Sequence, residues 1–372
     1  MKNILKKWLY LLFAAFACCA GTVLADGDHS RRLFIDRDVD TFAVLPQGVK
    51  FPEGITANPR NGDIYVATFE GGAQNKLLRF DRRGRPEATR NFGITPLLGL
   101  EFDRINRKVY IANVGNFVGL ASRIQRIAAN FNGGTAIEDV AEIPLVNAPN
   151  PRTVGNPDGS SDQIFFGTGA RVPNAMVLNR AGNLLYVSDS FQGVIFGISN
   201  PATCNPCSIE MINHDPLLAT AGFPPFGANG LALSHDEKTL YIANTGDDRV
   251  LKLDLTVSPL TPNSVSVFAE GINGADGLAI DKRGRVWVAA NQADEVVALN
   301  DKGKVVAKLG EFRGIRGNGT PIGLLFPASL VIVDDEIFVT NLALPLTDTV
   351  TGDEPEEDVS RWTVSRLKMP HH

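Results

Sequence analysis

Four oxygen-bearing residues stand at equivalent points of a repeated sequence pattern and form a candidate cation site. They are Glu53, Asn174, Asn229 and Asp276, and each begins a short run of mostly apolar residues. Two carboxylates and two carboxamides offer two negative charges and neutral oxygen atoms, the ligands that Ca²⁺ prefers. The equivalent positions hold neither His nor Cys, which argues against zinc or copper. We therefore expect a divalent metal, Ca²⁺ before others, with water or substrate completing its coordination.

Turn chemistry is the simpler explanation for these residues, because Asn and Asp often open strands. Four such side chains buried together would be costly without a partner, and this favours the metal.

A second set of polar residues ends the next apolar run of each repeat. The set is Thr68, Asn113, Asp189, Asn244, Asn291 and Asn341. We expect it to surround the first set, with Asn113, Asn244 and Asn291 as candidate substrate contacts. Asp189 is its only charged member and could orient a substrate or a water. The alternative is that these residues cap turns, as polar residues at strand ends usually do.

Six copies of one unit carry both sets. Each copy has an apolar run, a turn, and a second run in which an aromatic residue precedes Val or Ile. The first runs begin at Glu53, Leu98, Asn174, Asn229, Asp276 and Ala328. The aromatic residues are Tyr65, Tyr110, Tyr186, Tyr241, Trp287 and Phe338. We expect these aromatic side chains to fill the core between repeats.

Each unit predicts four short antiparallel strands, which is typical of a propeller blade. The third strand is seen at 76–80 and the fourth at 264–268. The sequence therefore predicts an all-β fold, a six-bladed β-propeller in a single domain over 26–372. We expect both ends of the chain to close the ring, with 361–367 as the third strand of the last blade and 41–45 as its outermost strand.

Long insertions are expected on one face of this propeller. Residues 147–170 and 200–228 precede the first strands of blades three and four, and 342–360 follow the second strand of blade six. Loops gathered on one rim of a rigid scaffold usually build a site, although insertions are also simply tolerated on surfaces.

Residues 1–25 have the pattern of a cleaved signal peptide. Lys2, Lys6 and Lys7 precede a short apolar run, and Val23-Leu24-Ala25 offers a cleavage site. The sequence thus predicts an exported protein, periplasmic or secreted, with a lipoprotein anchored at Cys18 as the alternative. No later segment is apolar enough to span a membrane. The net charge of −5 makes nucleic acid an unlikely partner.

Cys204 and Cys207 are the cysteines that remain after this cleavage. In an exported protein their C-x-x-C spacing predicts a disulfide in a small loop. A redox dithiol would need a helix start beside it, and a zinc site would need two further ligands.

The repeats and the four oxygen-bearing residues resemble those of the senescence-marker-protein-30/gluconolactonase superfamily, which includes the paraoxonases. The matching motifs are Pro52-Glu53-Gly54, Asn174 after Pro173, Asn229-Gly-Leu-Ala-Leu-Ser234 and Asp276-Gly-Leu-Ala-Ile-Asp281. In that family the matching Glu, Asn, Asn and Asp surround a divalent metal, and many members hydrolyse lactones or related esters. The resemblance implies a small-molecule lactone or ester as the substrate here.

The sequence departs from the family pattern near the expected pocket. Gluconolactonase-type enzymes have an Arg two residues before the first Asn, whereas this chain has Val172 there and Arg171 one residue earlier. Arg171 is the candidate substrate contact at this point, and sugar-lactone specificity is in doubt. Paraoxonase-like enzymes place a second Asn after the Asp, where this chain has Gly277, and histidines at the channel mouth, for which His214 is the candidate.

A hydrolytic mechanism would use Asp276 as the base that takes a proton from water, with Asp189 as the alternative base. The sequence has no Gly-x-Ser-x-Gly elbow, which disfavours a serine-hydrolase route. Two other functions stay open. One is a non-catalytic propeller with NHL-like repeats that binds a ligand or protein and holds a structural calcium. The other is a quinone-dependent sugar dehydrogenase, for which no basic, histidine-bearing pocket is evident.

Overall fold

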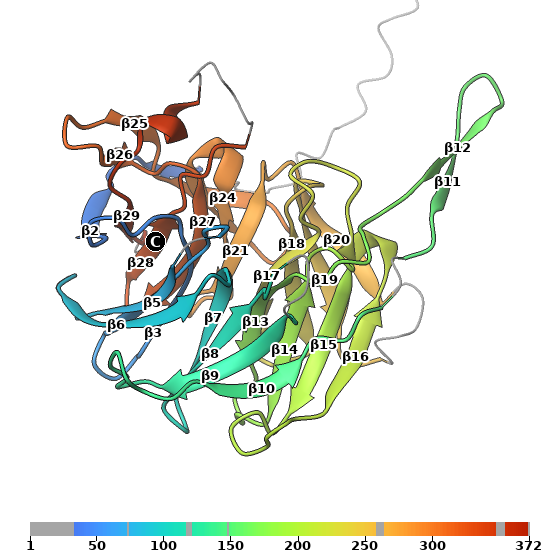
Figure 1. Ribbon diagram of the computed structural model, residues 1–372. Helices are drawn as coiled ribbons and strands as arrows, with labels where there is room; N and C mark the ends of the chain where they lie inside the picture. The colour runs from blue at the N-terminus through green and yellow to red at the C-terminus, as the bar shows by residue number, and fades with distance from the viewer. Residues whose placement is uncertain are drawn as a thin grey trace, which may run out of the picture. The chain divides into compact units, whose positions relative to one another are not determined.

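Short strands dominate the chain because β-branched and aromatic residues alternate with polar ones between turns rich in Gly, Asn and Asp. The computed structural model describes residues 33–72, 74–116, 121–146, 149–257, 264–346 and 354–370. Within these residues six antiparallel sheets form the blades of a propeller (Figure 1). The predicted fold class is therefore confirmed, while the expected signal peptide at 1–25 lies outside the described residues.

Five of the blades follow the chain in order, from the innermost strand outward. Blade one is β3 (Pro52–Ala57), β4 (Ile64–Thr68), β5 (Asn75–Phe80) and β6 (Pro86–Gly93). Blade two is β7 (Leu97–Asp103), β8 (Lys108–Asn113), β9 (Arg123–Ala128) and β10 (Glu138–Glu142). Blade three is β13 (Pro173–Leu178), β14 (Leu184–Asp189), β15 (Val194–Ser199) and β16 (Ile209–His214). Blade four is β17 (Ala228–Leu233), β18 (Thr239–Asn244), β19 (Arg249–Asp254) and β20 (Val265–Glu270). Blade five is β21 (Ala275–Ile280), β22 (Val286–Ala290), β23 (Glu295–Leu299) and β24 (Val305–Leu309).

Blade six closes the ring with strands from both ends of the described chain. Its inner strands are β27 (Pro327–Val333), β28 (Glu336–Asn341) and β29 (Thr363–Lys368), and β2 (Asp40–Val44) pairs antiparallel with β29 as the outermost strand. The predicted closure is thus confirmed. The strand before it, β1 (Phe34–Asp36), was not expected and runs parallel to β24 at the edge of blade five.

The innermost strands enclose a central channel. β3, β7, β13, β17, β21 and β27 contact one another in this order, and β27 contacts β3. The predicted role of the repeated aromatic residues is also confirmed. Trp287 is fully buried, and Tyr65 stacks on Phe102 of the next blade with ring centroids 5.8 Å apart. These side chains join neighbouring blades, so the inner strands have fixed positions around the channel.

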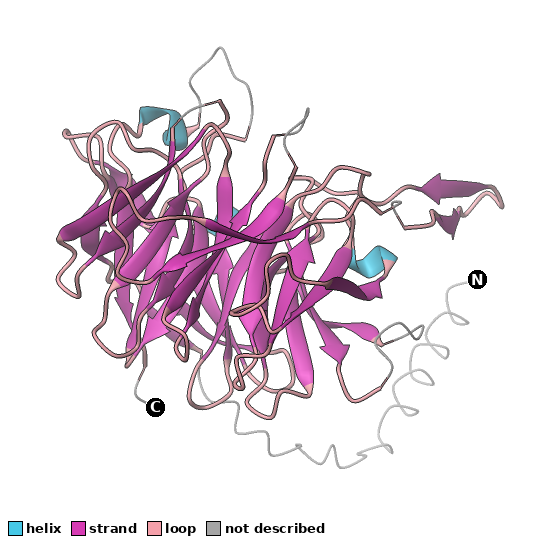
Figure 2. Ribbon diagram, turned by 60° about the horizontal axis from the view of Figure 1, so that its bottom comes forward, coloured by secondary structure: helices cyan, strands magenta, loops and turns pink. Residues whose placement is uncertain are grey.

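One face of the propeller, which we call the loop face, carries the connections between blades and those between second and third strands. The hairpin of β11 (Arg152–Gly155) and β12 (Ser161–Ile164) precedes blade three and projects from the body (Figure 2). A second hairpin, of β25 (Phe312–Ile315) and β26 (Pro321–Gly323), precedes blade six and was not anticipated. The remaining elements are short 3-10 turns: η1 (Pro216–Leu218), η2 (Asn291–Ala293) and η3 (Pro355–Asp358). No helix within the described ranges is long and apolar enough to cross a membrane.

The expected insertion at 200–228 is wrong in its first half. Residues 209–214 form β16, the fourth strand of blade three, so 200–208 connect its third and fourth strands. Because strands alternate in direction, this connection lies on the face opposite the loop face. Only 215–227 remain as the insertion before blade four.

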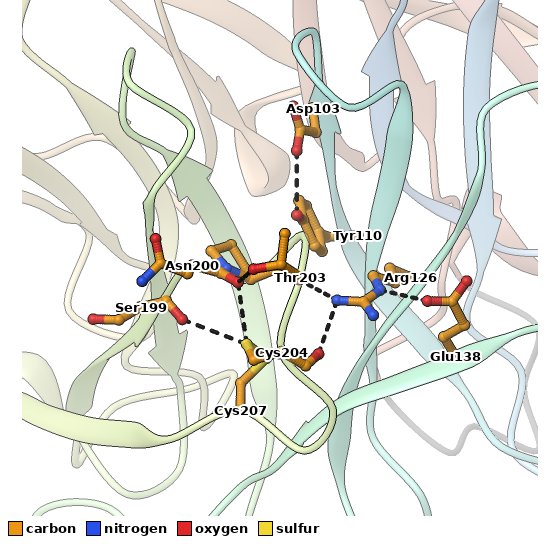
Figure 3. The surroundings of a disulfide bond; sticks show 10 residues. Asp103, Tyr110, Arg126, Glu138, Ser199, Asn200, Thr203, Cys204 and Cys207 are labelled. Atoms are coloured by element: carbon orange, nitrogen blue, oxygen red, sulfur yellow. Dashed lines mark hydrogen bonds and ion pairs between the residues drawn. A yellow bond between two sulfur atoms is a disulfide. The ribbon is translucent and has the colours of Figure 1, made fainter.

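Residues 200–208 contain the predicted disulfide. Cys204 and Cys207 are joined in the structure, with Cα atoms 4.9 Å apart (Figure 3). Arg126 of blade two donates to the backbone carbonyls of Pro201 and Cys204 and forms an ion pair with Glu138 at 2.7 Å. The loop is therefore held to the neighbouring blade, away from the four oxygen-bearing residues.

Candidate metal and substrate site

The predicted metal ligands share one structural position in their blades. In each blade the pairing of the first two strands is interrupted just after the first residue of the inner strand, for example between Pro52 and Ile55. Glu53, Asn174, Asn229 and Asp276 all fall in this interruption. Irregular pairing of this kind changes the direction in which side chains point, so that they no longer alternate between the two faces of the sheet. The repeated interruption thus aims four polar side chains at the channel.

Small residues let the inner strands come close at this level. A Cβ atom on Gly230 would lie 2.2 Å from the carbonyl oxygen of Asp276, and one on Gly99 would lie 2.3 Å from that of Asn174. No real side chain tolerates such contacts with backbone. Glycine at these two positions therefore allows the inner strands of neighbouring blades to approach each other closely.

All four predicted ligands line one cavity of about 40 Å³ at the loop face, and each is 3 to 5% exposed. Burial, together with the charge of Asp276, raises the pKa of Glu53 well above its usual value. Burial also raises the pKa of Asp276 to about 7, although hydrogen bonds from Asn291 and Asn229 act in the opposite direction. The ionised forms of these two buried acids are therefore unfavourable unless a cation lies beside them.

Hydroxyl groups fix the two amides. The Nδ2 atom of Asn174 donates to Ser190 Oγ at 3.0 Å, and this hydroxyl donates to the carbonyl of Ala228 at 2.7 Å. Asn229 repeats the arrangement one blade on, through Thr245 and Ala275, at the same distances. Each amide nitrogen is held by its own blade, which leaves the amide oxygen available to the channel.

These residues fit a hard cation. Glu53 Oε2 and Asp276 Oδ1 are buried and have no hydrogen-bond partner among the described residues. Such atoms are rare in folded proteins and costly, and a divalent cation held by these carboxylates would offset the cost. The described ranges contain no group of three or more His, Cys, Asp and Glu that could hold a metal. A metal here would therefore depend on the two amide oxygens as well as on the two carboxylates.

The second predicted set divides into caps and one channel residue. Asp189 accepts hydrogen bonds from the backbone N–H groups of Val172, Phe191 and Gln192. Asn113, Asn244 and Asn341 likewise bond to neighbouring loops and strands. Asp189, Asn113 and Asn244 line neither cavity described here. The structure places these residues as strand-end caps, which does not support their predicted roles as base or substrate contacts.

Asn291 differs because its register is shifted by one residue. Ala275 pairs with Ala290, whereas Ala228 pairs with Asn244, so Asn291 occupies the place of Thr245 in its blade. Its Nδ2 atom donates to Asp276 Oδ2 at 3.0 Å. A Cβ atom added to Gly274 would collide with the Oδ1 atom of Asn291, so a residue without a side chain is needed there. Asn291 therefore holds Asp276 directly, a role that depends on a one-residue offset invisible in the sequence.

Arg171 and His214 lie away from the ligands. Arg171 forms an ion pair with Glu142 at 3.2 Å and donates to the carbonyl of Ile143. His214 lies in β16, the outermost strand of blade three, where burial lowers the pKa of its imidazole. Neither residue lines a cavity described here. The structure gives no support to their predicted contacts with substrate.

Apolar side chains form the wall above the ligands. They come from the loop face and from the inner strand of blade two: Phe69, Leu98, Pro224, Phe226, Phe326, Leu342, Leu344 and Leu346. This wall could not be predicted from the sequence, because its members are scattered over loops without any periodic pattern.

A larger cavity of about 360 Å³ occupies the other half of the channel and reaches Glu53, Asn174 and Asn229 from below. Glu101 lines it, and burial raises the pKa of this carboxyl to about 8. The ligands thus separate an apolar cavity at the loop face from a wider one at the opposite face.

Part of this chain is similar in sequence to known proteins. Residues 221–310, which include Asn229 and Asp276, match the family described as SMP-30/Gluconolactonase/LRE-like region. Lactonase drp35 of Staphylococcus saprophyticus is 28% identical over 136 residues, which cover 35% of this chain and 34% of that protein. The match therefore spans about a third of the relative's length.

Solved structures share the fold over most of the chain. A luciferin-regenerating enzyme superposes with a TM-score of 0.58 at 15% identity, covering 87% of this chain and 93% of the other. Regucalcin of Agrobacterium tumefaciens, described as a calcium-binding protein, gives 0.57 at 15% identity, covering 91% and 96%. Virginiamycin B lyase of Staphylococcus aureus gives 0.52 at 11% identity, covering 90% and 99%. At these identities the likeness to solved structures shows the fold alone. The resemblance inferred from the sequence motifs is confirmed by the family match over 221–310.

Proposed function

We propose that this six-bladed propeller, with its SMP-30/gluconolactonase/LRE-like region, is a metal-dependent hydrolase of lactones or related esters. The observation that carries the proposal is the pair of buried carboxylate oxygens of Glu53 and Asp276, without partners among the described residues, at the floor of an open cavity. The lactonase relative supports the reaction class, and the neighbour described as calcium-binding supports Ca²⁺ as the metal.

Glu53, Asn174, Asn229 and Asp276 would hold the metal. A bound Ca²⁺ supplies Lewis acidity that polarises a carbonyl and stabilises the charge that develops on its oxygen. The chain's own residues do the rest. The apolar wall excludes bulk water and positions the substrate carbonyl over the floor. Asn291 donates to Asp276 Oδ2 and so fixes this carboxylate, which would accept a proton from the attacking water. Because the hydrogen bonds of Asp189 tie it to its own loop, Asp276 is the better candidate base.

Substitution of Asp276 separates a hydrolase from a binding protein. Asp276→Asn keeps the size of the side chain but removes its charge and its basicity. We expect kcat/KM on lactones to fall at least about 100-fold, with the fold retained by circular dichroism. Asp301→Asn is the matched control, because it makes the same change at an exposed turn of the same blade.

Two outcomes would count against the proposal. Lactone hydrolysis at wild-type rate in Asp276→Asn would exclude this carboxylate as the base. Absence of hydrolysis in the wild-type protein, with bound metal and a loss of thermal stability in the variant, would favour the non-catalytic propeller with a structural calcium.

We also propose that the protein is exported after removal of residues 1–25 and acts as one domain. The disulfide between Cys204 and Cys207 agrees with an oxidising compartment. Intact-mass measurement of the mature protein should give a chain that starts at Asp26 and lacks two hydrogens. A retained N-terminus, or a lipid on Cys18, would contradict this proposal.

A further inference from the structure

We infer that the cavity at the loop face selects lactones that carry an apolar alkyl or aryl substituent and rejects polyhydroxylated ones. The inference rests on the proposed function and adds the substrate class. It is carried by the chemistry of the cavity wall, which is independent of the metal ligands.

The wall is apolar on several sides of the channel. Phe69 follows the second strand of blade one, Phe226 precedes blade four, Phe326 precedes blade six, and Leu344 follows the second strand of blade six. Leu98 occupies the ligand-equivalent position in the inner strand of blade two and lines the same cavity. Blade two therefore contributes a hydrocarbon group at the level where blades one, three, four and five contribute oxygen atoms.

The polar groups of the cavity are confined to its floor. Besides the four candidate ligands, only Asn291 and Thr245 among the described lining residues carry polar side chains. The Thr245 hydroxyl accepts from Asn229 and donates to Ala275, and the Asn291 amide donates to Asp276. No Lys, Arg, His, Ser or Tyr lines the described wall.

A sugar lactone would bring several hydroxyl groups against this wall. Burying hydroxyls without hydrogen-bond partners opposes binding, because the bonds they make with water are lost. An alkyl or aryl substituent has no such groups and gains from leaving water among phenylalanine and leucine side chains. The cavity of about 40 Å³ that the ligands and this wall enclose admits only a few heavy atoms, such as the carbonyl end of a substrate and the first carbons of its substituent. The substituent would then lie along the apolar wall.

The test compares three lactones of the same ring size in the wild-type holoprotein: δ-valerolactone, δ-decanolactone and glucono-δ-lactone. We expect kcat/KM to rise by up to about fourfold for each of the first methylene groups of the substituent. We expect glucono-δ-lactone to be hydrolysed more slowly than δ-valerolactone. Leu344→Ser should reduce the ratio of the δ-decanolactone and δ-valerolactone rates. Leu145→Ser is the matched control, because Leu145 is 63% exposed and does not line the cavity.

The outcomes distinguish the substrate class from the reaction. Hydrolysis of glucono-δ-lactone at or above the δ-decanolactone rate would overturn the substrate class and leave the lactonase intact. A ratio unchanged by Leu344→Ser would show that this wall does not contact the substituent. If no lactone is hydrolysed, the proposed function fails, and calorimetric titration of the three lactones decides the selectivity. Binding of δ-decanolactone alone would support the apolar site, and equal binding or none would overturn it.

Discussion

Glu53 and Asp276 are two acids that the fold brings together against their mutual repulsion. Burial raises both pKa values, that of Asp276 to about 7, and the charge of Asp276 raises that of Glu53 further. Without a cation, the pair therefore holds protons that a metal must displace. The amides of Asn174 and Asn229 add oxygen ligands without adding negative charge, which limits this cost.

Metal affinity should consequently depend on pH. The raised pKa values mean that protons compete with Ca²⁺ for both carboxylates, and at Asp276 they do so below about pH 7. We expect the apparent Kd for Ca²⁺ to fall by up to about tenfold per pH unit between pH 5 and 7 for each proton released. Calorimetric titration in two buffers of different ionisation enthalpy measures the released protons directly. A Kd that does not change over this range would show that protons do not compete with Ca²⁺ for Glu53 and Asp276.

The four candidate ligands could be found in the sequence because they recur at one place in each repeat. The residues that hold them could not. Ser190 and Thr245 bind the amides through hydroxyls that look like ordinary strand-end residues, and Asn291 reaches Asp276 through a one-residue offset. The position of Arg171 close before Asn174 predicts a contact with substrate, yet its guanidinium pairs with Glu142. Side-chain direction at strand ends depends on register, which the repeat pattern does not specify.

At the scale of the strands, a broken pairing and a small residue create the site. Each ligand falls where the first two strands lose register, and a glycine follows three of the four. The glycines allow carbonyl groups of the next inner strand to approach. The strands and their order were predictable from alternation and turns, but the interruption was not, because the repeat pattern does not specify the register of a strand pair.

Gly230→Ala tests this close approach. The added Cβ atom would lie 2.2 Å from the carbonyl oxygen of Asp276, so the inner strands of blades four and five must separate. We expect a loss of about 1–3 kcal/mol in the free energy of unfolding, measured by chemical denaturation, with weaker Ca²⁺ binding. In Gly155→Ala, the control, the new Cβ atom meets no atom within 4 Å and should change neither quantity. Unchanged Ca²⁺ affinity in Gly230→Ala would show that strand spacing does not set the geometry of the site.

For the molecule as a whole, closure of the ring keeps the ligands of distant blades in place. Blade six joins β2 from the start of the described chain to β27, β28 and β29 from its end. Phe42 contacts Phe338 edge-on with ring centroids 4.7 Å apart, and Leu45 is fully buried. The sequence predicted this closure from one apolar run before blade one. It did not predict β1, whose three residues are half-buried or exposed and carry little pattern.

Removal of β2 should therefore weaken the whole propeller. A chain starting at residue 47 loses the outermost strand of blade six and the burial of Leu45. We expect its free energy of unfolding to fall by at least about 2 kcal/mol, together with its Ca²⁺ affinity. A chain starting at residue 39 loses only β1 and should lose much less stability. Equal stability of the two truncated chains in urea would contradict closure by β2.

The most direct test of the account is lactone hydrolysis before and after removal of metal. Hydrolysis of δ-decanolactone and metal content would be measured on the same preparation as isolated, after chelation, and after Ca²⁺ is returned. We predict one divalent ion per chain, loss of hydrolysis with the chelator, and recovery with Ca²⁺. Full hydrolysis by protein shown to contain no metal would mean that Glu53, Asn174, Asn229 and Asp276 do not form a metal centre on which the reaction depends.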